Sequence, residues 1–188
     1  PFIEAPMLSR ILGCDLTLKL ENIQHTSSFK ARGAYIAMQA LDEASRQRGV
    51  ITMSAGNHAQ AVAYHASKMG IPATIVMPAQ TPFAKVSRTH AFGADVVLEG
   101  RNLNECEGTV NRLIAERELS LIHPYDNELV MMGQGTAGLE MLTDKPDLDI
   151  LLVPIGGGGL MGGIATIARD MRPDITIIGV QTELYPAM

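Results

Sequence analysis

Short apolar runs rich in β-branched residues alternate along the chain with longer stretches in which alanine and other apolar residues recur at helical spacing. The apolar runs predict strands at residues 15–20, 50–53, 73–77, 95–98, 150–155 and 175–180. The stretches between them predict helices at residues 29–48, 58–69, 82–92, 102–118, 134–143 and 160–171. This alternation indicates an α/β fold with mostly parallel sheets, and apolar runs such as residues 150–153 suit strands covered by helices on both faces.

The composition narrows the classes of partner. Of the 188 residues, 46% are hydrophobic, which is enough for a substantial core. The 15 basic and 20 acidic residues give a net charge of -5, which provides no field to attract nucleic acid or an anionic membrane. No apolar run approaches the roughly 20 residues that span a bilayer. The only cysteines, Cys14 and Cys106, form no CxxC pair, so we expect neither disulfides nor a thiolate metal site, and a cytoplasmic location.

The first candidate site is Lys30, which follows a turn rich in hydroxyls and falls in the first turn of a predicted helix. The helix macrodipole disfavours a cation there, so this lysine is either exposed to solvent or kept neutral. A neutral amine is the form that attacks a carbonyl carbon. By position alone, an ordinary solvated surface lysine is the favoured interpretation.

The second candidate is the segment from Ser54 to Gln60, which joins a strand to a helix. Gly56 allows the backbone to bend and Asn57 can cap the helix, so the turn offers free N–H groups to a carboxylate or a phosphate. The alternative is an ordinary turn in which His58 is merely packed or exposed.

The third candidate is the glycine-rich segment from Gly156 to Gly163, between a strand and a helix. Its backbone N–H groups can close around phosphate oxygens at the positive end of the helix. The same residues match the dinucleotide fingerprint, which also requires an acidic residue at the end of the next strand. Gln181 stands there and Glu183 comes two residues late, so dinucleotide binding ranks second. No lysine and hydroxyl follow the glycines as in a P-loop.

Four motifs in order resemble the fold-type II pyridoxal phosphate enzymes, in the serine/threonine dehydratase (threonine ammonia-lyase) and serine racemase branch. They are SFKARGA at residues 28–34, SAGNHAQ at 54–60, GQGT at 133–136 and VPIGGGGL at 153–160. The resemblance implies open, mostly parallel twisted sheets in two lobes with flanking helices. Residues 1–49 and 130–188 would belong to a large lobe, and residues 50–129 to a small inserted lobe that closes on substrate.

The resemblance also implies a role for each matching residue. Lys30 would carry pyridoxal 5'-phosphate as a Schiff base and later act as the base at Cα, beside the packed ring of Phe29. Asn57 would bind the phenolic oxygen of the cofactor. The cofactor phosphate would lie on the backbone of Gly156, Gly157, Gly158, Gly159 and Leu160. The substrate carboxylate would lie on the turn formed by Ser54, Ala55, Gly56, Asn57 and His58.

The implied reaction is elimination of the β-hydroxyl of threonine or serine, giving a 2-oxo acid and ammonia. Related racemases carry a serine as second base where this chain has Ala55, so dehydration is favoured over racemisation. Serine racemase, 3-hydroxyaspartate dehydratase, an NAD(P)-dependent oxidoreductase using Gly156–Gly163 and a non-catalytic phosphate-binding module remain as alternatives. The resemblance implies a homodimer, and it gives no basis for inferring a metal site.

Two departures from the family pattern affect the expected site. Ser27 stands where the family usually has glycine. The chain begins at Pro1 and stops at Met188 soon after a predicted strand, so we expect a fragment that lacks the C-terminal third and its partner for the pyridine nitrogen.

Overall fold

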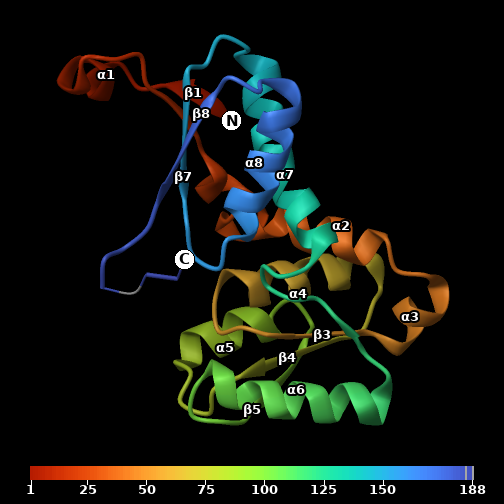
Figure 1. Cartoon of the computed structure of the whole chain (residues 1–188). Helices are drawn as coiled ribbons and strands as arrows, with labels where there is room; N and C mark the ends of the chain where they lie inside the picture. Colours follow the sequence, from red (N-terminus) through yellow and green to blue (C-terminus); the bar gives the residue numbers. More distant parts are fainter. Residues whose placement is uncertain (185, 188) are drawn as a thin grey trace.

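Three small sheets and the helices around them make up the computed structural model, which describes residues 1–184 and 186–187 (Figure 1). In chain order the elements are β1 (Phe2–Glu4), α1 (Pro6–Leu12), β2 (Thr17–Lys19), η1 (Glu21–Ile23), η2 (His25–Ser27), α2 (Lys30–Gln39), α3 (Glu43–Arg48), β3 (Val50–Met53), α4 (Asn57–Met69), β4 (Ala73–Met77), α5 (Phe83–His90), β5 (Asp95–Leu98), α6 (Leu103–Arg117), β6 (Ser120–Leu121), α7 (Glu128–Asp144), β7 (Ile150–Pro154), α8 (Gly159–Met171) and β8 (Thr176–Val180). None of these helices is both long and apolar enough to cross a bilayer.

The largest sheet has four parallel strands in the order β5-β4-β3-β6. Its central strands β3 and β4 are buried along nearly their whole length because helices cover both faces. Val50 and Ile75 point into a core shared with α4, whereas Ile51 and Val76 point into a core shared with α6. This alternation follows from the two-residue period of a strand.

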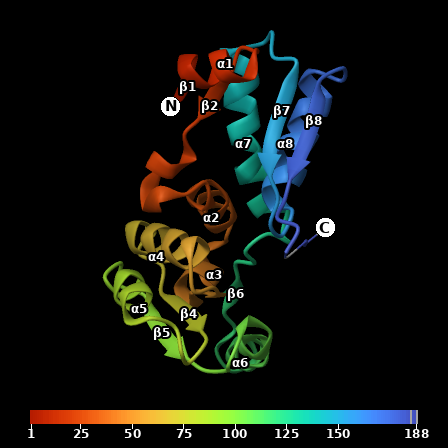
Figure 2. The same cartoon turned by 90° about the vertical axis from the view of Figure 1, so that its left-hand side faces the viewer.

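Helix α2 lies between this sheet and the second group of elements, in which α7 and α8 cover the parallel pair β7-β8 (Figure 2). Leu151 and Val153 of β7 are buried against Ile164 and Ala168 of α8. The remaining pair, β1-β2, is antiparallel. The α/β prediction with mostly parallel sheets is therefore confirmed.

Several predicted boundaries were wrong for local reasons. The helix predicted at residues 29–48 is two helices, α2 and α3, because the Asp42 side chain accepts a hydrogen bond from the Ser45 N–H and starts a new helix. Helix α7 begins six residues before the predicted residue 134, capped by Asn127 through the Val130 N–H. The sequence patterns also missed β1, α1 and β6.

Candidate active site

A cavity of about 300 Å³ opens between the start of α2, the loop after β7 and the connection from β6 to α7. Its lining brings together two of the three segments singled out in the sequence. The lining residues are Phe29, Lys30, Tyr125, Pro154, Ile155, Gly156, Gly157, Gly158, Gly159 and Leu160. The site thus forms at carboxyl ends of parallel strands, where open α/β sheets bind their ligands.

Lys30 is the first residue of α2, and its side chain points inward. Its backbone N–H donates to Ser28 Oγ at 3.2 Å, which satisfies one of the free donors at the helix start. The ammonium Nζ donates to the carbonyl oxygen of Pro124 at 2.5 Å and lies 5.3 Å from the ring centre of Phe29. The amine is therefore held by one main-chain acceptor beside an aromatic ring.

Burial lowers the pKa of Lys30 from 10.5 to about 8. Removal from water disfavours the charged form, and no carboxylate is bonded to the amine to offset this effect among the described residues. A lowered pKa of Lys30 agrees with the expectation from the sequence. That expectation relied on the helix macrodipole, whereas the cause in the structure is burial. A substantial neutral fraction is thus present near pH 8.

The glycine loop after β7 has the form of an anion cradle. Gly158 is the N-cap of α8 and has φ of 83°, in the left-handed region that favours glycine. A Cβ on Gly156 would meet no atom within 4 Å, so the loop leaves open space next to its backbone. The cradle and its helix N-terminus have the chemistry to hold a phosphate group, and phosphate binding there stays a prediction.

The second segment lies apart from this lining. Ser54 Oγ accepts from the Gly56 N–H at 3.2 Å, which forms a local turn before α4. Gly56 is the N-cap of α4 and Asn57 its first residue, so the prediction that the Asn57 side chain caps this helix was wrong. None of the residues from Ser54 to His58 lines the described cavity. Asn57 is exposed, and His58 is buried with Nε2 2.9 Å from Ile122 O.

Sequence reasoning missed Pro124 and Tyr125, which supply the acceptor for Lys30 and part of the cavity wall. Both lie just after β6, a strand of two residues that the apolar pattern does not reveal. The sequence signal that could have revealed this part of the cavity wall was a histidine, a proline and a tyrosine in a short connection ahead of a predicted helix.

Arg32, two residues after Lys30 in α2, connects the site to neighbouring elements. Its guanidinium donates to both oxygens of Glu21, to both oxygens of Glu140 on α7, and to Thr136 Oγ1 at 2.9 Å. Hydrogen bonding from Arg32 is the main reason that the pKa of Glu140 falls to about 2. This network fixes α2, and with it Lys30, against α7.

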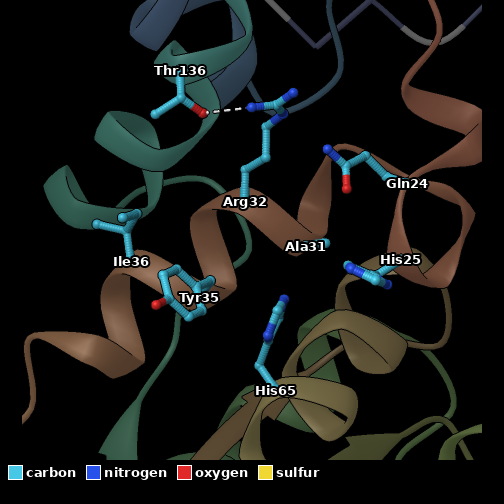
Figure 3. A pocket seen from close by; sticks show the side chains of 8 residues that line it. All are labelled: Gln24, His25, Ala31, Arg32, Tyr35, Ile36, His65 and Thr136. Atoms are coloured by element: carbon cyan, nitrogen blue, oxygen red, sulfur yellow. Dashed lines mark hydrogen bonds between the residues drawn. The ribbon is translucent and has the colours of Figure 1, made fainter. Parts of the chain in front are cut away.

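A second hollow of about 220 Å³ lies beside α2, and Lys30 is not among its lining residues (Figure 3). His25, His65 and Tyr35 project toward it, and Arg32 with Thr136 forms another part of its wall. None of the predicted cofactor-binding residues lines this hollow.

The model of the family described as "Pyridoxal-phosphate dependent enzyme" matches residues 1–188. The chain belongs to the pyridoxal-phosphate dependent enzymes. Lys30 and the glycine loop, which share one cavity, are the features of this member that fit an aldehyde carrying a phosphate.

Within this family the curated relatives include two L-threonine ammonia-lyases. The Thermotoga maritima protein is 46% identical over 97% of this chain and 45% of its own length. The Geobacter sulfurreducens protein is 47% identical over 98% of this chain and 46% of its own length. The chain thus spans about half the length of the curated relatives it matches.

Solved structures of the family agree with the fold. Processed threonine deaminase isoform 2 from Solanum lycopersicum superposes with a TM-score of 0.93 and 41% identity, covering 96% of this chain and 50% of that one. Serine racemase from Dictyostelium discoideum gives a TM-score of 0.93 and 36% identity, covering 97% of this chain and 60% of that one. The predicted fold-type II architecture is confirmed.

Proposed function

We propose that this protein takes part in eliminating the β-hydroxyl of threonine or serine, with pyridoxal phosphate bound covalently at Lys30. The observation that carries the proposal is a lysine of lowered pKa in one cavity with a four-glycine anion cradle. Similarity to two L-threonine ammonia-lyases supports the reaction class.

Lys30 has two tasks in this proposal. Its neutral amine, populated because burial lowers the pKa to about 8, attaches the cofactor and later removes the proton from the substrate Cα. When bound, pyridoxal phosphate supplies an electron sink for the negative charge that develops on Cα as the proton is removed. The Phe29 ring next to the amine limits water around it.

The other residues bind and orient. Backbone N–H groups from Gly156 to Leu160 would hold the phosphate at the start of α8. Asn57 would bind the phenolic oxygen, and the turn from Ser54 to His58 would bind the substrate carboxylate. Because these residues do not line the described cavity, we propose that residues 50–129 form a lobe that closes on substrate.

The choice of reaction rests on Ala55. Its methyl group cannot move a proton, so a second base for racemisation is missing at this position, and dehydration is the favoured outcome. Serine racemisation and 3-hydroxyaspartate dehydration remain alternatives within the family, and comparison of the three substrates separates them. We also propose a homo-oligomer, which the family resemblance implies, in the cytoplasm, which suits two cysteines that form no CxxC pair.

The test is to incubate the full-length protein with pyridoxal phosphate, reduce it with borohydride and map the modified peptide by mass spectrometry. We expect the label on Lys30 and a visible absorption band that Lys30→Ala abolishes along with threonine turnover. Lys85→Ala, on exposed helix α5, is the matched control and should keep both. Label on scattered surface lysines, or full turnover by Lys30→Ala, would contradict the proposal.

A further inference from the structure

The segment 122–125, here called the bridge, joins three parts of the site that lie far apart in sequence. Ile122 contacts α4 through the His58 side chain, and Pro124 accepts from Lys30 of α2. Tyr125 packs against the glycine loop so closely that a Cβ on Gly159 would lie 2.9 Å from its carbonyl oxygen. A displacement of the bridge would therefore reach both Lys30 and the phosphate cradle.

His58 holds the first end of the bridge with a defined tautomer. Its side chain is 2% exposed, and Nε2 lies 2.9 Å from the Ile122 carbonyl oxygen. A carbonyl oxygen can only accept, so Nε2 carries the hydrogen. Nδ1 is then an unprotonated nitrogen, buried without a hydrogen-bond partner among the described residues.

The imidazole stays neutral under ordinary conditions. The pKa of His58 is lowered to about 4, mainly by burial, with smaller contributions in the same direction from the nearby Lys30 and His123. The pKa of His123 on the bridge is also lowered, mainly by burial. Near pH 8 neither histidine carries a charge, so the influence of His58 on Lys30 passes through the hydrogen bond to Ile122.

The bridge is stiff between its two ends. The ring nitrogen Nδ1 of His123 accepts from the Asp126 N–H at 2.8 Å, and the His123 and Tyr125 ring centres lie 4.7 Å apart. Only His123 separates Ile122 from Pro124, so a shift of the Ile122 carbonyl also displaces the Pro124 carbonyl.

We propose that His58 is a positioning residue for Lys30, which holds the bridge so that the Pro124 carbonyl receives the lysine amine. This side-chain role differs from the substrate contact through the His58 backbone, and its importance for catalysis rests on the proposed function of Lys30. Without the donor, the Ile122 carbonyl loses its partner, the bridge relaxes and water reaches the amine.

The test measures the titration of Lys30 in the full-length protein without cofactor, by trace acetylation with acetic anhydride between pH 6 and 11 and mass spectrometry of the Lys30 peptide. We expect a midpoint near the pKa of about 8 in the parent protein. In His58→Leu we expect a rise of about one pH unit, which lowers the acetylation of Lys30 at pH 8 roughly fivefold.

Two further variants separate positioning from loss of packing. His58→Gln places an amide N–H near the former Nε2 and should restore the parent midpoint. His65→Leu, which alters a histidine on the same helix without a bond to the bridge, should leave it unchanged. Should His58→Leu fail to fold, His58→Asn, whose amide is too short to reach Ile122, takes its place with the same expected rise.

An unchanged midpoint in the folded donor-less variant would overturn the proposal, and so would equal shifts in it and in His58→Gln. The proposed function fails in a different way, by absence of borohydride-fixed label on Lys30. Because acetylation is measured without cofactor, that failure leaves the result on His58 readable.

Discussion

Arg32 and Glu140 face each other as a two-pronged pair, with Nη1–Oε1 and Nη2–Oε2 distances of 2.6 and 2.7 Å. The planar guanidinium matches the carboxylate in this geometry, and Lys19 adds a contact to Glu140 at 2.5 Å. The pair joins the helix of Lys30 to α7.

Arg32→Lys keeps the charge and loses the fork, because a single ammonium cannot meet Glu21, Glu140 and Thr136 together. We expect the free energy of unfolding to fall by about 1–3 kcal/mol, measured by urea denaturation. Arg112→Lys is the matched control, because its ion pairs are half-exposed, and it should change stability by less than about 0.5 kcal/mol. Equal losses of unfolding free energy in both variants would contradict a special role for the two-pronged Arg32 guanidinium.

His58 should make the fold sensitive to acid. Its folded pKa of about 4 lies below the ordinary 6.5, so the unfolded chain binds more protons between these values. Stability is therefore lost as the pH falls from 6.5 toward 4, by at most about 3 kcal/mol. Denaturation curves of the parent at pH 7, 5.5 and 4 measure the loss, and His58→Gln, which does not titrate, should show a smaller one. Parallel losses in both proteins would exclude His58 as the source.

Ser27 has φ of 57°, a left-handed conformation in which a side chain is strained. Ser27→Gly should raise the free energy of unfolding by roughly 1 kcal/mol, after the greater freedom of glycine in the unfolded chain is counted. Ser87→Gly lies inside helix α5 and should lower it by about 0.5 kcal/mol. Thermal unfolding of the two variants checks the opposite signs, and destabilisation by Ser27→Gly would show that the conformation is not strained.

Gly158 and Gly156 form a matched pair for the cradle. Gly158→Ala puts a side chain at φ of 83° and should lower stability by about 1 kcal/mol, whereas Gly156→Ala enters open space and should change it by less than about 0.5 kcal/mol. Chemical denaturation without cofactor isolates this backbone effect. Equal destabilisation by the two substitutions would contradict it.

Local sequence was sufficient where a feature depends on neighbours along the chain. The strand bounds of 50–53, 73–77 and 95–98 are confirmed because apolar runs end at turn residues. The prediction for helix α7 began six residues too late, because glycines such as Gly133 have weak helix propensity. Lys30 and the glycine loop were predicted together from the resemblance, and the structure places them in one cavity.

The rest depends on contacts across long separations. Pro124 meets Lys30 across 94 residues, and that meeting depends on the pairing of a two-residue strand with β3, which no periodicity reveals. The strain at Ser27 is likewise a backbone property, visible in the sequence only as a departure from a family glycine.

The two anchors of the bridge differ in how they are encoded. At Pro124 the acceptor is a peptide carbonyl, which every amino acid supplies, so mutation of that codon alters the contact only through backbone shape. At the other end the donor is a side-chain atom of His58, which a single nucleotide change can remove. In the connection between α4 and the reactive lysine, a substitution at Pro124 therefore keeps the acceptor, whereas a substitution at His58 can remove the donor.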